Sequence, residues 1–253
     1  LDRSSAASDV YKRQAMAANI EAANSNTGVS QKGGVDIVNI ATPNQHGLSH
    51  NQFNQFNVGK SGAVLNNSRQ AGRSELAGDL GANANLRDQA AAVILNEVVS
   101  KNPSLILGKQ EVFGMAADYV LANPNGITVK DGGFINTNRA SLVVGKPEMK
   151  AGRLESLGVG GNTAAKLDVQ GQLGGANVLD LVAPKVVVAA NADVQAVDAI
   201  NMVSGNSKVA LKDDGTVGVE AAKAAAATEA APAAEAVPTV TRTRTVTKWV
   251  EET

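Results

Sequence analysis

The chain of 253 residues has no cysteine and only seven aromatic residues, 3% of its length. Without cysteine it can form neither a disulfide framework nor a cysteine-built zinc site. No apolar run in the sequence approaches the ~18 residues that a membrane-spanning helix needs. The 23 basic and 24 acidic residues nearly cancel. That balance argues against a basic surface for nucleic acid, so we expect no nucleic-acid partner.

Small aliphatic residues, glycine and asparagine take the place of the missing rings. The apolar fraction is 43%, which is enough to bury a core, and there are 25 glycines. A core of Val, Leu, Ile and Ala beside many turn-forming residues indicates thin, repetitive β layers.

Short apolar clusters recur about every seven residues. One series contains Val120, Ile127, Phe134 and Leu142, and a second contains Leu173, Leu179, Val186, Val194, Ile200 and Val209. A coiled-coil heptad has the same spacing, but Pro124, Pro184 and the glycines between the clusters would break a helix. Short strands joined by tight Asn/Gly turns fit the pattern better.

Two β architectures remain compatible with this pattern, a meander or sandwich and a three-faced parallel β-helix. In the β-helix three short strands make a coil of about 21 residues. Its narrow interior suits small aliphatic side chains, and its turns use Gly or Asn at positive φ. We therefore favour an all-β solenoid with five to six coils within residues 92–212.

A solenoid needs a cap because its end strands carry unpaired backbone groups. Residues 34–68 are the candidate for this N-terminal β cap. We expect one strand around Val35–Ile40 and a second around Phe53–Val58. The candidate cap residues are His46, His50, Asn51, Phe53, Asn54 and Phe56.

His46 and His50 have the i, i+4 spacing of a helical metal pair. Gly47 and the Asn/Gln-rich surroundings argue against a helix there. We expect polar cap contacts for both histidines, and neither a metal nor a cofactor.

The chain divides into three segments. Residues 1–17 are predicted to be a disordered leader remnant or an artefact, because 1–14 match nothing that follows and Ala15–Ala17 fits a small-x-small cleavage pattern. Residues 18–218 form the ordered domain. Residues 219–253 are an Ala/Pro-rich linker and a short tail, whose alternating TVTRTRTVTKWVEET predicts one exposed strand.

Several motifs resemble the two-partner-secretion (TPS) domain of filamentous haemagglutinins, haemolysins and contact-dependent inhibition proteins. HGLSHNQFNQFNV at 46–58 and GAVLNNS at 62–68 look like the start of that domain. Asn102-Pro103-Ser104-Leu105 is similar to its NPNL-type motif, and Asn123-Pro124-Asn125-Gly126-Ile127 matches its NPNGI motif, with GGFINT following at 132–137. Segments 179–196 and 200–209 are similar to its last coils.

Two departures from the family pattern stand out. Ser104 replaces the second Asn of NPNL. The stretch after NPNGI, residues 128–131, lacks the cysteine pair of some contact-dependent inhibition members. The chain is therefore closer to the cysteine-free haemagglutinin branch.

The resemblance implies a transport signal rather than an enzyme. It implies a right-handed β-helix, recognised in the periplasm by POTRA domains of a partner outer-membrane β-barrel and threaded out unfolded. The implied location is the surface or surroundings of a Gram-negative cell, with the protein a monomer. Host cells or neighbouring bacteria are then partners only through downstream cargo.

The motif residues have a physical role of their own. Asn before Pro is held out of the helical region, and Asn-Gly supplies the positive φ of a tight turn. Asn123–Ile127 is thus a rigid turn between strands at 119–122 and 127–129. It either sets the coil register or contacts the transporter, and the two roles are compatible.

Two other functions remain open. One is a surface adhesin module, because stacked β faces offer flat binding surfaces. The other is a polysaccharide lyase or hydrolase of the pectin type, with Asp168, Asp180 and Lys185 as candidate residues. These three do not repeat with coil spacing, which weakens the enzyme hypothesis.

Overall fold

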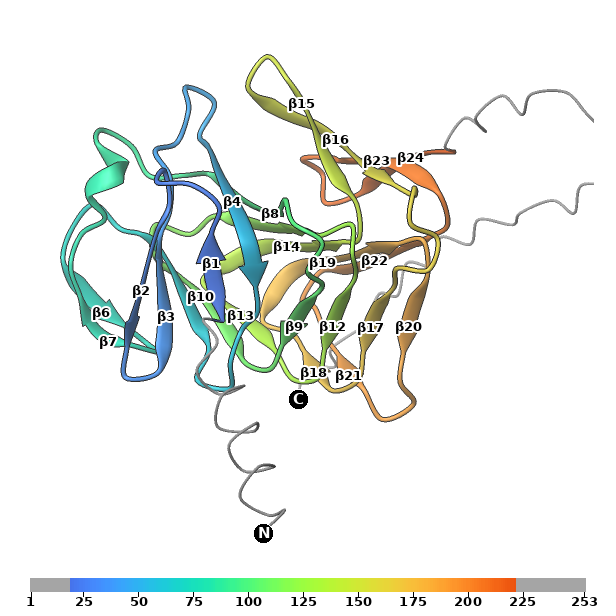
Figure 1. Ribbon diagram of the computed structural model, residues 1–253, viewed down its shortest axis with the longest axis horizontal. Helices are drawn as coiled ribbons and strands as arrows, with labels where there is room; N and C mark the ends of the chain where they lie inside the picture. Colours follow the sequence, from blue (N-terminus) through green and yellow to red (C-terminus); the bar gives the residue numbers. More distant parts are fainter. Residues whose placement is uncertain (1–18, 222–253) are drawn as a thin grey trace, which may run out of the picture.

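The computed structural model describes residues 19–221 (Figure 1). The predicted leader at 1–17, and the tail from residue 222 onward with its predicted strand, lie outside these residues. The described part is almost entirely β, with one short 3-10 helix, η1 (Ala84–Leu86). Within this range no helix is long and apolar enough to cross a membrane.

Three mostly parallel sheets form the body. Sheet I contains β1 (Ile20–Ala22), β4 (Leu48–Phe56), β8 (Val93–Val98), β11 (Asp118–Ala122), β14 (Thr137–Val143), β19 (Ala176–Ala183) and β22 (Ala199–Ser204). Sheet II contains β9 (Ser104–Ile106), β12 (Ile127–Val129), β17 (Leu167–Val169) and β20 (Val186–Val188). Sheet III contains β2 (Gly28–Lys32), β3 (Val35–Asn39), β5 (Ala63–Asn67), β10 (Lys109–Gly114) and β13 (Gly133–Ile135), and a separate pair joins β18 (Gln172–Leu173) to β21 (Asp193–Val194).

The chain visits the three sheets in turn, so each circuit is one coil of a parallel β-helix. β8, β9 and β10 make one coil, and β11, β12 and β13 the next. Tyr119 lies beside Ala140, and Leu179 beside Ile200, each pair 21 residues apart. The predicted all-β solenoid and its coil length are confirmed.

The coil count differs from the prediction. Between residues 93 and 204 the chain completes four coils and begins a fifth with β22. The reason is that two segments leave the solenoid. Ala140 and Leu179, neighbours in the sheet, are 39 residues apart because a hairpin is inserted between them.

That hairpin is β15 (Lys146–Lys150) with β16 (Arg153–Val159), which confirms the excursion that the sequence indicated. β16 pairs antiparallel with β23 (Ser207–Leu211), and β23 with β24 (Val217–Ala221). Figure 1 shows this four-stranded sheet standing over the strands of sheet I. A smaller hairpin, β6 (Gly72–Ser74) and β7 (Gly78–Leu80), lies against sheet III.

Two antiparallel strands cover the N-terminal end of the solenoid. β1 pairs with β4, and β2 pairs with β3. β4 and β5, which lie in the block predicted as the cap, pair in parallel with β8 and β10 and therefore form the first coil. The capping strands thus precede most of that block.

At the other end β22 and β20 are the last strands of their sheets. Nothing in residues 19–221 stacks on this last coil, and Val188 and Val197 are 39% and 74% exposed.

The strands of sheet I bury both faces. Their inner side chains, such as Tyr119 and Leu142, belong to the main core that runs through the coils. Their outer side chains, such as Val143 and Val182, form a second cluster with Leu157 and Val209 of the extrahelical sheet. Apolar residues at consecutive strand positions are expected where both faces are covered.

Candidate functional site

The two Asn-Pro motifs lie at the same corner of the solenoid, in successive coils. Asn102–Leu105 leads from β8 into β9, and Asn123–Ile127 leads from β11 into β12. Ile127 lies beside Ser104 in the parallel ladder. The strands predicted to flank the second turn, at 119–122 and 127–129, are confirmed as β11 and β12.

Asn123 is fully buried at this corner. Its amide nitrogen donates to the backbone oxygen of Asn102 at 3.0 Å and to Oγ of Ser104 at 2.9 Å. Its Oδ1 accepts the backbone N–H of Asn125 at 2.9 Å, which closes the turn. Ser104, the departure from the family motif, is therefore itself a partner of the second motif.

Asn125 and Gly126 complete the turn. The Asn125 amide donates to the Ser100 carbonyl, one coil earlier, at 2.9 Å. Gly126 has φ +117°, and an added Cβ would lie 3.3 Å from the Lys166 carbonyl oxygen of the next coil. The expected positive φ is thus found at the glycine, where L side chains are strained.

The same arrangement continues one coil earlier. The Asn102 amide donates to the Asn54 carbonyl at 2.9 Å. The backbone N–H of Leu105 donates to Oδ1 of Asn57 at 2.8 Å. These contacts link three consecutive coils, and we call Asn54, Asn57, Asn102, Asn123 and Asn125 the asparagine corner.

Exposure divides the motif residues into two groups. Asn102 and Pro103 are exposed, and Leu105, Pro124 and Asn125 are half-buried. Asn123, Ser104 and Ile127 are buried. In the folded domain a partner could therefore contact only part of either motif.

The predicted cap residues lie on β4 or next to it. Phe53 and Phe56 are fully buried, with ring centroids 4.9 Å apart in an edge-to-face arrangement. Asn51 is also fully buried, and its Oδ1 accepts from the Ala41 N–H at 2.8 Å and the Thr27 hydroxyl at 2.9 Å. The structure therefore brings these three together in the first coil.

The two histidines have different surroundings. His50 on β4 pairs with the Glu97 carboxylate on β8 at 2.7 Å, and this bond holds the pKa of Glu97 below its ordinary value. His46 precedes β4 and lies near Gly152 at the tip of the β15–β16 hairpin. Among residues 19–221, no three His, Asp or Glu side chains are grouped so that they could hold a metal ion.

The residues considered for polysaccharide chemistry do not converge. Asp168 lies on β17 in sheet II, where it pairs with Lys166 at 2.7 Å. Asp180 lies on β19 in sheet I, is fully buried, and accepts hydrogen bonds from Arg139, Ser141 and Asn201. Its carboxylate is fully engaged in the fold.

A second asparagine-rich corner was not anticipated from the sequence. Asn67 is fully buried, donates to the Ala91 and Met115 carbonyls at 2.9 and 2.8 Å, and accepts the Ala91 N–H at 2.7 Å. Asn83 bridges the carbonyls of Ile40 and Asn66. The signal was the asparagine pair in GAVLNNS, 62–68, which falls where β5 ends.

A solenoid with such turns has a known counterpart among exported proteins. The structure is similar to the crystal structure of a filamentous hemagglutinin secretion domain, with a TM-score of 0.65 and 33% identity over 76% of this chain and 65% of that chain. The chain is thus built as a β-helical secretion domain.

The family assignment rests on most of the sequence. The TPS secretion domain family matches residues 14–244, so the chain belongs to this family. It is 52% identical to a hemolysin of Serratia marcescens over 80% of its length, and 46% identical to filamentous hemagglutinin of Bordetella pertussis over 47%. It spans only 13% and 3% of those two relatives.

Proposed function

We propose that this domain is the export signal of a two-partner-secreted protein. In this proposal POTRA domains of a partner outer-membrane β-barrel bind the chain in the periplasm of a Gram-negative cell. The domain then folds outside the cell as a monomer and nucleates the β-helix. Membership of the TPS secretion domain family supports the secretion role.

The activities of the relatives stay with the relatives. Their names describe hemolysins, a filamentous hemagglutinin and nuclease toxins. The chain covers 13% and 10% of the two hemolysins and 5% of the tRNA nuclease CdiA of Yersinia mollaretii. The TPS family is one of secretion-targeting domains, so we assign no catalysis to this domain.

The burial of Asn123 is the observation that supports recognition before folding. In the folded domain its amide is bonded to Asn102 and Ser104 and has no exposed surface. A transporter domain that contacted this side chain would have to meet the chain while it is still extended. Asn102 and Pro103 are exposed in the folded domain, so they could be contacted in either state.

The direction of the hydrogen bonds supports folding in the order of export. Side chains of a later coil donate to carbonyls of an earlier one, as Asn102 does to Asn54 and Asn125 to Ser100. Each new coil therefore finds its acceptors already in place. A solenoid can propagate in this way through nearest-neighbour contacts.

The test compares Asn123→Ala with Asn67→Ala, two buried asparagines at different corners. Each removal leaves buried backbone partners without a hydrogen bond, at a cost of about 1–3 kcal/mol. The chain is co-expressed with its cognate transporter, and the medium is assayed for the domain. The stability and refolding of both purified variants are measured in urea.

We expect Asn123→Ala to reduce secretion more than Asn67→Ala at equal loss of stability. Equal secretion defects at equal stability would mean that Asn123 acts only through the fold. Release of the unaltered domain without the transporter would overturn the proposal as a whole.

A further inference from the structure

The antiparallel sheet outside the solenoid is attached to it in a way that allows it to detach. We call β15, β16, β23 and β24 the lid sheet. Both of its halves are excursions: residues 146–159 leave between β14 and β17, and residues 207–221 follow β22. The lid strands pair only with one another within the described chain, so the ladders of the coils do not depend on them.

The apolar contact between the lid sheet and the solenoid is a small one. Leu157 and Val209 are the fully buried lid residues, and they pack in one cluster with Val182 and Val203 of sheet I. Leu154, Leu211, Val217 and Val219 are only half-buried at its margin. Surfaces that bury little apolar area open at lower free energy than the core does.

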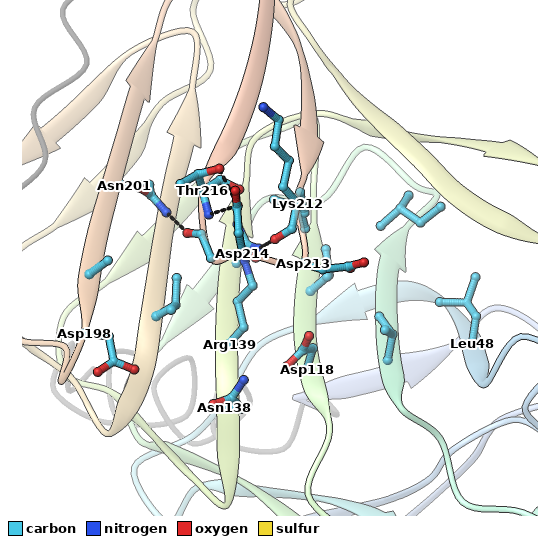
Figure 2. A pocket seen from close by; sticks show the side chains of 18 of the residues that line it. Leu48, Asp118, Asn138, Arg139, Asp198, Asn201, Lys212, Asp213, Asp214 and Thr216 are labelled. Atoms are coloured by element: carbon cyan, nitrogen blue, oxygen red, sulfur yellow. Dashed lines mark hydrogen bonds between the residues drawn. The ribbon is translucent and has the colours of Figure 1, made fainter.

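A polar anchor holds the turn between β23 and β24. Asp180 accepts from the Arg139 Nε at 2.7 Å and from the Asn201 amide at 2.7 Å. Arg139 then donates to the carbonyls of Lys212 and Thr216, and Asn201 donates to the Gly215 carbonyl at 2.8 Å. Figure 2 shows Arg139 and Asn201 rising from sheet I toward this turn. The anchor thus contacts backbone atoms of the lid sheet.

A pocket of about 700 Å³ lies beside the anchor, between sheet I and the lid sheet. Asp118, Asp198 and Asp213 lie around it together with apolar side chains such as Val93 and Leu154. Burial raises the pKa of Asp118. The lid sheet therefore does not pack tightly over this part of sheet I.

We propose that the lid sheet opens as one unit while the coils beneath it stay folded. The small apolar contact, the single anchored turn, the adjacent pocket and the independent coil ladders all favour such an opening. Opening uncovers the outer side chains of β19 and β22 but leaves their inner side chains in the core. This inference concerns the folded domain and does not depend on the proposed transporter.

Single thiols test the proposal, because the natural chain has no cysteine. Val182→Cys lies beneath the lid sheet, and Val209→Cys lies within it. Ala183→Cys is the matched control, since Ala183 is the next residue on the same strand and faces the inner core. All three positions are fully buried. The rate of reaction with Ellman's reagent is measured on folded protein, with circular dichroism and urea midpoints as folding controls.

We expect Val182→Cys and Val209→Cys to react at similar rates, about tenfold or more faster than Ala183→Cys, as for a sub-global opening. Equal rates at all three positions would show that only global unfolding exposes them. Protection of Val182→Cys as strong as that of Ala183→Cys would show that the lid sheet does not lift.

A second variant weakens the anchor without entering the inner core. Asn201→Ala removes the hydrogen bonds to Asp180 and Gly215. Combined with Val182→Cys it should raise the thiol reaction rate severalfold, and combined with Ala183→Cys it should leave the rate nearly unchanged. An equal rise at both positions would contradict the proposal.

Discussion

The asparagine corner and the anchor of the lid sheet both bury polar side chains, but with different chemistry. At the corner, neutral amides donate to backbone carbonyls of the preceding coil. At the anchor, an ion pair between Arg139 and Asp180 is almost fully removed from water. A neutral amide costs less to bury than a charge and can recur coil after coil. A buried ion pair is costly unless every partner is in place.

The largest effect is expected from breaking the ion pair on one side. Arg139→Met leaves Asp180 buried without its cation, which should lower the free energy of unfolding by about 3–5 kcal/mol. The double variant Arg139→Met/Asp180→Leu removes both charges and should regain most of that loss. Urea unfolding measures both. A double variant as unstable as the single one would mean that the charge itself is not the cause.

An intermediate effect is expected from placing a charge at the asparagine corner. Asn123→Asp keeps the shape but cannot donate to the Asn102 carbonyl when it is ionised. Burial would raise the pKa of the new carboxyl. The loss should therefore exceed the about 1–3 kcal/mol of a lost buried hydrogen bond at pH 7, and shrink as the pH falls and the carboxyl is protonated.

The measurement is the free energy of unfolding of Asn123→Asp at pH 5 and pH 7, relative to the unaltered chain. Asn125→Asp is the control, because Asn125 is only half-buried and its carboxylate can be hydrated. If the two variants showed the same pH dependence, the corner would tolerate charge as well as a solvated turn does.

The smallest effect is expected at the partly exposed pair of His50 and Glu97. Hydrogen bonding from His50 holds the pKa of Glu97 below its ordinary value of 4.5. Because the pKa is lowered in the folded state, this stabilisation is complete above pH 4.5 and is lost as the pH falls through the folded value.

Glu97→Gln should therefore reduce stability at pH 7 by less than about 1 kcal/mol. The difference from the unaltered chain should vanish at acidic pH. Urea midpoints across the pH range measure it. A difference that grew on acidification would show that Glu97 does not contribute through its charged form.

The sequence predicts the coils better than it predicts the lid sheet. Ile127 and Phe134 fall on β12 and β13, where the pattern expects strands, because each strand follows from local apolar residues and the next turn. β15 and β16 were expected only as an excursion, since their pairing with β23 joins segments about 50 residues apart. Such long-range antiparallel pairing leaves little trace in a local pattern.

The site was predictable to a similar degree. Asn123 and Gly126 were identified from their motif, and their turn is as expected. The anchor was missed although its residues follow coil spacing: Asn201 lies 21 residues after Asp180, and Arg139 lies 41 before it. The inserted hairpin accounts for the longer interval and hides the repeat.

The antiparallel pairing of β1 and β2 at one end has a consequence for how the molecule can grow. Because these strands run against the first coil, no further parallel coil can be added in register there. At the opposite end β20 and β22 present open edges within the described chain. The domain is thus a one-ended seed, and elongation can run only from the amino to the carboxyl direction, the order in which a ribosome or a pore delivers a chain.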